Sequence, residues 1–143
     1  MKIGLYSELA RENIVKGRAY IAKMGLSPNR EGIQKFRKQI INLNDPHLKS
    51  LQQFNDFYSV STLRDALFHV QEHRFTIPKI SKALDELGLK FIGFEFSNRT
   101  STQNFKIAYP ENGSAYDLEK WHDFETKNPL LFIDMYQFWV QKS

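Results

Sequence analysis

The sequence contains no cysteine among its 143 residues, which excludes disulfide-stapled folds, cysteine-ligated zinc, iron–sulfur clusters and thiol nucleophiles. Glycine is also scarce, because the chain has seven and no two lie closer than five positions. Phosphate-binding loops need clustered glycines, since the backbone must approach the ligand with no Cβ in the way. The motifs GxGxxG, GxxxxGK[ST] and GxSxG are all missing, so we expect no nucleotide-binding loop and no hydrolase nucleophile turn.

Long apolar runs are missing as well. The longest is Leu130–Ile133, and the N-terminal segment turns polar at Ser7 and Glu8. A membrane-spanning helix needs about 20 apolar residues, and a secretory signal needs an apolar region of roughly 7–15 residues. We therefore expect a cytoplasmic protein with no membrane segment. The composition, 41% hydrophobic and 25% charged, is typical of a folded globular chain long enough for one domain.

Charge and aromatic residues are unevenly placed. Residues 1–50 carry ten Lys/Arg against four Asp/Glu, whereas twelve of the twenty aromatic residues lie from Phe91 onward. The basic helices could face nucleic acid through Arg11, Lys16, Arg18, Lys23, Arg30, Lys35, Arg37 and Lys38. No aromatic platform is interleaved with them and no helix-turn-helix signature is present. The pattern favours a solvated helical face, and nucleic acid is not an expected partner.

Hydrophobic spacing predicts a mixed α/β chain that is mostly helical. Strands are expected at 1–6 and 89–96, where apolar, aromatic and β-branched residues form short runs. The segment 7–24 reads as a helix that Gly25 ends, and its small residues Ala10 and Gly17 would let it pack closely on a sheet. Further helices are expected at 27–43, 48–54, 61–70, 76–87, 114–124 and from 129, where Phe132, Met135, Tyr136 and Trp139 have helical spacing.

Polar side chains are dense between residues 56 and 74. His69 and His73, with Glu72 between them, spell the inverted zinc-protease motif HxxEH, and Glu119 or Glu125 could supply a third ligand. The break at Thr76–Pro78 instead favours hydrogen bonds around a turn between two helices. The same cluster could line a pocket in which histidine acts as acid or base. The alternative is a solvated linker with a buried Arg–Asp or Arg–Glu pair, which is commoner than an active site. The pocket candidates are Tyr58, Arg64, His69, Glu72 and His73.

Several strings together resemble one family. Met1–Arg11 (MKIGLYSELAR) is similar to the segment that follows a Pro-Gly-Gly turn in bacterial class I S-adenosylmethionine-dependent methyltransferases fused to tetratricopeptide repeats. The later part of those proteins resembles Asp56–Ser59 (DFYS), Arg64–Asp65, Phe68–Thr76 (FHVQEHRFT), Leu87–Leu89, Phe91–Glu95 (FIGFE) and Trp121, Phe124–Glu125, Asn128–Pro129, Phe132 and Met135–Lys142 (MYQFWVQK).

The resemblance implies a Rossmann-like sheet of which this chain holds the C-terminal part, with two or three strands. Residues 1–25 would be the fifth strand and its helix, 26–75 a helical insertion, 76–97 a helix and the sixth strand, and 98–143 aromatic C-terminal helices on the substrate side. The glycine-rich loop and the acidic residue that hold the cofactor would precede Met1. No catalytic or cofactor-binding residue can therefore be transferred onto this chain, and no metal site is implied.

We expect the substrate-side portion of a methyltransferase that neither binds S-adenosylmethionine nor catalyses methyl transfer alone. Its partner would be a complementing methyltransferase half or a second copy of the chain, and the methyl acceptor is unidentified. The alternative is a non-catalytic interaction module that pairs through its exposed first strand, because an unpaired strand offers backbone donors and acceptors to a partner.

Overall fold

The computed structural model describes residues 1–68 and 72–143, apart from the side chains of Asn55 and Asp56. The described chain is mixed α/β and mostly helical, as expected, but its sheet has four strands rather than two or three. It divides into two compact units, of which the first comprises residues 1–10 and 73–143 and the second comprises residues 11–72. The expected boundaries differ, because they assigned the helix 7–24 to the sheet-containing part.

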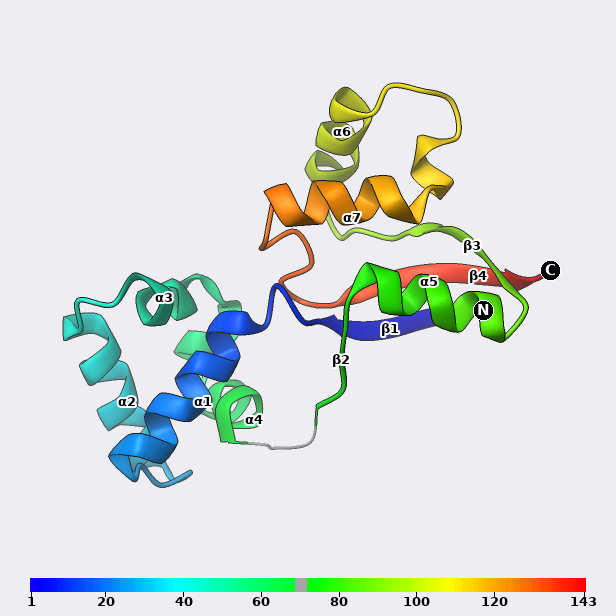
Figure 1. Ribbon diagram of the computed structural model, residues 1–143. Helices are drawn as coiled ribbons and strands as arrows, with labels where there is room; N and C mark the ends of the chain where they lie inside the picture. Colours follow the sequence, from blue (N-terminus) through cyan, green and yellow to red (C-terminus); the bar gives the residue numbers. More distant parts are fainter. Residues whose placement is uncertain (69–71) are drawn as a thin grey trace. The chain divides into compact units, whose positions relative to one another are not determined.

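The first unit contains the sheet and three α-helices (Figure 1). Its elements are β1 (Lys2–Ser7), β2 (Arg74–Phe75), α5 (Ile77–Glu86), β3 (Leu89–Phe94), α6 (Arg99–Ala108), the 3-10 turn η3 (Ser114–Tyr116), α7 (Leu118–Lys127) and β4 (Tyr136–Lys142). The strand order is β2-β1-β4-β3. β2 is parallel to β1, whereas β4 is antiparallel to both β1 and β3, so β1, β2 and β3 run in one direction and β4 is reversed.

The C-terminal helix expected from residue 129 is wrong, because Tyr136–Lys142 is a strand. Tyr136, Phe138 and Val140 are buried while Trp139 is 46% exposed, which is the alternation of a strand with one face in a core. This segment pairs with β1 on one side and β3 on the other. Long-range pairing on both sides therefore determines that this segment is a strand, although its aromatic spacing also fits a helix.

One aromatic-rich core fills the first unit. Side chains of α5, α6, α7 and the strands meet there, and the buried members are Ile77, Ile80, Leu84, Phe91, Phe105, Trp121, Phe124, Phe132, Tyr136, Phe138 and Val140. Phe105 stacks on Trp121 with ring centroids 3.5 Å apart. The concentration of aromatic residues late in the sequence is thus the core of this unit.

The start and end of α5 follow the sequence. The Thr76 side chain accepts a hydrogen bond from the Lys79 N–H at 3.3 Å, and Pro78 lies in the first turn, where its missing donor costs nothing. The chain leaves this helix through Gly88, whose φ of 63° is the left-handed conformation that glycine adopts most easily.

The second unit is entirely helical over its described residues. Its elements are α1 (Glu12–Met24), α2 (Arg30–Asn42), α3 (Pro46–Lys49), the 3-10 turns η1 (Ser50–Gln53) and η2 (Asn55–Tyr58), and α4 (Val60–Phe68). The expected close contact of Gly17 exists, but with helical neighbours of this unit rather than a sheet. A Cβ at Gly17 would lie 2.9 Å from Leu51 Cδ1 and 3.1 Å from Leu67 Cδ2.

Candidate functional site

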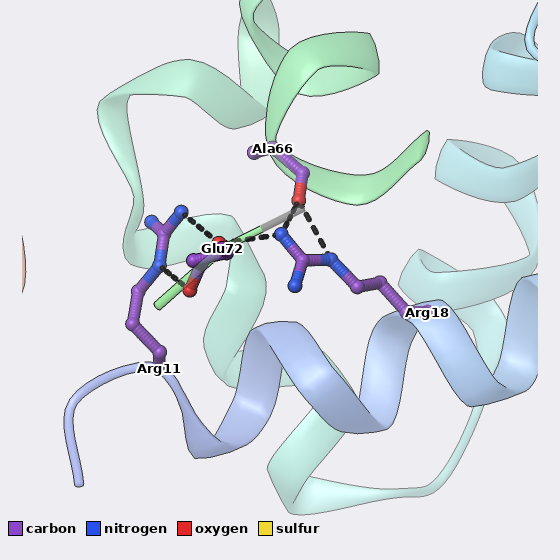
Figure 2. A network of polar contacts seen from close by, with 4 residues as sticks. All are labelled: Arg11, Arg18, Ala66 and Glu72. Carbon is purple, nitrogen blue, oxygen red and sulfur yellow. Dashed lines mark hydrogen bonds and ion pairs between the residues drawn. The ribbon is translucent and has the colours of Figure 1, made fainter. Parts of the chain in front are cut away.

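Glu72, one of the pocket candidates, lies at the centre of a buried ion-pair network in the second unit (Figure 2). Arg11 donates from Nε to Oε1 at 3.1 Å and from Nη2 to Oε2 at 3.0 Å. Arg18 donates from Nη2 to Oε2 at 2.6 Å and binds the Ala66 carbonyl through Nε and Nη2. The glutamate is therefore held by two cations that both belong to α1 or the residue before it.

These contacts determine the charge of Glu72. Burial would raise the pKa of this carboxyl, but the hydrogen bonds from Arg11 and Arg18 outweigh it, so the pKa lies below its ordinary value. A general base needs a pKa near the working pH and a free lone pair toward the substrate. The pKa of Glu72 is shifted away from that range and both of its carboxyl oxygens already accept hydrogen bonds from arginine, so its role in the structure is to tie the end of the second unit to α1. This is a buried Arg–Glu pair, the alternative that the sequence left open.

The other candidates do not gather around Glu72. Tyr58 ends η2 and is 71% exposed, and Arg64 is exposed on α4. His73 is exposed and belongs to the first unit, whereas His69 lies outside the described residues. Among the residues that the structure describes, no three His, Cys, Asp or Glu side chains are placed to hold a metal ion.

The first unit contains a buried polar cluster that sequence reasoning missed. Ser7, Glu125 and Tyr136 are each at most 2% exposed. Ser7 Oγ donates to Glu125 Oε1 at 2.6 Å, and the Tyr136 hydroxyl lies 2.7 and 2.9 Å from the two carboxyl oxygens. Ser7 Oγ also accepts from the Ala10 N–H at 3.1 Å. One carboxyl group joins three segments that are distant in the sequence: the end of β1, the last turn of α7 and the start of β4.

Burial controls the titration of this cluster. Removal from water raises the pKa of Glu125, although the hydroxyls of Ser7 and Tyr136 partly oppose the shift by hydrogen bonding to the carboxylate. Burial, with the carboxyl group beside it, also raises the pKa of Tyr136, which stays protonated. Both donors are neutral hydroxyls, so the Glu125 site differs from the Glu72 site, where arginines supply the opposite charge.

The cluster marks one edge of the sheet. Ser7 ends β1, and because β4 is antiparallel to β1, its first residue, Tyr136, lies at the same edge. Open α/β sheets bind ligands outside the carboxyl ends of their parallel strands, which makes this edge the candidate functional site. Ser7 itself is fully buried, so its hydroxyl positions the end of β1 and does not meet a substrate in this conformation.

A cleft of about 290 Å³ lies at the same edge, beyond the end of β3. Its polar lining comes from Glu95, Ser97, Asn98, Ser101, Asp134 and Gln137, and its apolar lining includes Phe96, Phe132 and Met135. Such a mixture suits a small polar ligand with one apolar side. Residues of the segments 97–101 and 130–135 both contribute to this lining.

A second hollow lies between α5 and α7. It has a volume of about 580 Å³, with Ile77, Pro78 and Leu118 as its apolar part and Ser81, Lys82, Asp85, Glu119 and His122 as its polar part. This hollow is on the helical layer rather than at the strand ends. We therefore rank it behind the carboxyl edge of the sheet as a candidate for chemistry on a substrate.

Comparison with known proteins yields no relative: no family model matches the chain, and no curated protein is significantly similar to it. In the residues that the structure describes, no helix has the length and apolar character that a membrane crossing requires.

Proposed function

We propose that this chain is the substrate-side C-terminal portion of an S-adenosylmethionine-dependent methyltransferase, unable to bind the cofactor or catalyse methyl transfer alone. The observation that carries the proposal is the strand order β1-β4-β3. β1 and β3 run in the same direction with the reversed β4 between them. With β1 as the fifth strand and β3 as the sixth, β4 becomes the seventh, a reversed strand within an otherwise parallel sheet.

The side of β1 that faces away from β4, here called the open edge of β1, has backbone groups that a further strand could pair with. Among the described residues, β2 pairs with β1 only at Tyr6 and Ser7. Met1 and Val140 exchange two hydrogen bonds, and the alternation of an antiparallel ladder then directs the N–H and C=O groups of Lys2 and Gly4 away from β4. These groups are available to a further strand, and in a methyltransferase that strand would belong to the cofactor-binding half.

The first test is calorimetry of the chain with S-adenosylmethionine. The proposal expects no heat of binding, and an affinity in the micromolar range would contradict it. The second test needs a cofactor-binding segment, which reading the DNA upstream of Met1 would identify. That segment is mixed with the chain and hydrogen exchange is measured. The amides of Lys2 and Gly4 should become protected on mixing, and cofactor binding should appear only in the mixture.

Two variants separate strand pairing from side-chain effects. Lys2→Pro removes the N–H on the open edge at the first residue of a strand, where proline is tolerated. Lys2→Gln keeps that N–H and removes only the 2.7 Å ion pair with Glu95. Pairing through β1 should be lost in Lys2→Pro and retained in Lys2→Gln.

The same open edge favours a second candidate, a non-catalytic module that pairs through β1 with a second copy. Light scattering across a concentration series tests it, because self-pairing predicts a dimer that Lys2→Pro returns to a monomer. A monomer at all concentrations would count against this candidate and leave the methyltransferase proposal standing.

A further inference from the structure

We infer that the exposed face of α2 in the second unit binds the phosphate backbone of duplex DNA. The net positive charge of the chain resides in this unit. Residues 11–72 carry ten Lys/Arg and six Asp/Glu, whereas the first unit carries ten of each. A basic face on a compact unit is the electrostatic footprint of a phosphate-binding surface.

The structure divides the cations of this unit into two groups. Arg11 and Arg18 are held by Glu72, and Arg37 donates from Nε to the Phe57 carbonyl at 2.8 Å. These three guanidinium groups have internal partners. The sequence alone did not distinguish them from the remaining basic residues of the unit, and therefore favoured one solvated face.

The remaining cations of α2 are exposed together. Arg30, Lys35 and Lys38 are exposed, and none of them has an ion-pair partner in the part of the chain that the structure describes. The opposite side of α2 is buried through Ile33, Phe36 and Ile40, so the three cations share the outer arc of the helix with one exposed carboxylate, that of Glu31. The arc still carries a net positive charge, and Lys35 and Lys38 are three positions apart, so a bound anion would relieve their mutual repulsion.

Amide side chains complete this face. Gln34 and Asn42 are exposed on the same arc, and a shallow hollow of about 310 Å³ beside them is lined by Tyr20, Lys38, Gln39, Asn42 and Leu43. The Tyr20 hydroxyl donates to Gln39 Oε1 at 3.0 Å, which holds the two walls together. Lys, Arg, Asn, Gln and Tyr are the side chains that contact phosphate and sugar oxygens in protein–DNA interfaces.

Duplex DNA fits this face better than the other polyanions. The major groove of B-form DNA is about 12 Å wide and admits one α-helix, whereas the A-form groove of double-stranded RNA is too narrow. A membrane surface needs an apolar helix face, but the outer arc of α2 has one large apolar residue, Ile41. Base stacking of single strands needs aromatic platforms, and the arc carries none.

The experiment measures fluorescence anisotropy of a labelled DNA duplex with the whole chain between 50 and 200 mM salt. Three phosphate contacts predict a slope of log K against log salt near −2.7, which is a loss of affinity of about 40-fold over this range. The variant Arg30→Gln/Lys35→Gln/Lys38→Gln should bind at least tenfold more weakly, with a slope close to zero because the three phosphate contacts that set the slope are removed. Circular dichroism verifies that the variant is folded.

The matched control changes the same residue types in the first unit. Arg99, Lys90 and Lys106 are exposed there, and replacing all three by Gln removes the same charge without touching α2. This control should keep the affinity and the slope. Equal weakening in both variants would show a general charge effect and overturn the inference, as would no binding at 50 mM salt.

A measurement without mutation gives an independent answer. Acetylation of the wild-type chain should be slowed by DNA at Lys35 and Lys38 and not at Lys90 or Lys106. Single-stranded RNA and vesicles of phosphatidylserine are the competing ligands. Tighter binding of either one than of the duplex, lost in the α2 variant, would assign the face to that ligand and overturn the inference.

Discussion

Removing the Tyr136 hydroxyl tests the buried cluster at the carboxyl edge of the sheet. Tyr136→Phe keeps the buried ring and deletes the donor that lies 2.7 and 2.9 Å from the Glu125 oxygens. The carboxylate then keeps only Ser7 as a side-chain donor among the contacts of this cluster. A hydrogen bond to a charged group contributes about 1.5–3 kcal/mol, and one between neutral groups about 0.5–1.5 kcal/mol.

The cost of this substitution should depend on pH. Burial raises the pKa of Glu125 above 4.5, so the folded chain retains this proton when the unfolded chain has already lost it. The stability contributed by the neutral carboxyl is complete below 4.5 and decreases as the pH rises above it. Tyr136→Phe should therefore cost about 1 kcal/mol at pH 4 and about 2 kcal/mol once Glu125 is ionised.

Urea unfolding followed by tryptophan fluorescence is the appropriate assay, because both tryptophans, Trp121 and Trp139, lie in the first unit. Tyr109→Phe is the matched control, since it removes a hydroxyl bonded to the exposed carboxylate of Asp123, and we expect little change. The charge-based reasoning would be refuted if Tyr136→Phe lowered the free energy of unfolding equally at pH 4 and at a pH where Glu125 is ionised, or more at pH 4. Glu125→Gln should abolish the pH dependence and gain stability relative to the wild type as the pH rises.

Three further substitutions probe the packing and the backbone. Gly17→Ala should destabilise the second unit by about 1–3 kcal/mol in far-ultraviolet circular dichroism, because its Cβ would meet Leu51 and Leu67 at 2.9 and 3.1 Å. Glu72→Gln should cost about 3 kcal/mol by removing the buried carboxylate that Arg11 and Arg18 bind, and should remove the loss of stability below pH 4.5 that its lowered pKa predicts. Gly88→Ala should cost about 1 kcal/mol in thermal unfolding from its left-handed backbone alone, with Gly88→Asn less costly, because nothing lies within 4 Å of the added Cβ.

The sequence predicted correctly those helices and strands that depend on residues close together in the chain. The helix from Thr76 to Gly88 and the strands at 1–6 and 89–96 lie at their expected places, because caps, glycine and β-branched or aromatic runs act over a few residues. The segment 136–142 was mistaken for a helix because its pairing partners are about 50 and 130 positions away. The sequence also predicted that the helix face around Gly17 packs on a sheet, but its neighbours Leu51 and Leu67 are helical residues. Hydrophobic periodicity identifies a buried stripe on a helix but not the element that covers it.

The buried cluster of the candidate site was harder to predict from the sequence than the fold was. Ser7 and Glu125 are separated by 118 positions, and each has an ordinary local role, as a turn cap and as a helix residue. Only the antiparallel pairing of β1 with β4 places Tyr136 beside them. Glu72 was predicted to line a pocket, and the structure shows instead that its polar partners include Arg11 and Arg18, which belong to α1 or precede it.

The position of β4 in the sheet has a consequence for synthesis of the chain. Synthesis proceeds from the N-terminus, so β1 and β3 leave the ribosome before β4, yet β4 lies between them and is the only strand that pairs with both in the described sheet. The helices of residues 11–72 make their contacts within one continuous segment and can fold while translation continues. The sheet cannot be completed before β4 is made, so a ribosome that stalls after β3 would release β1 and β3 with the edges that face β4 unpaired and prone to aggregate.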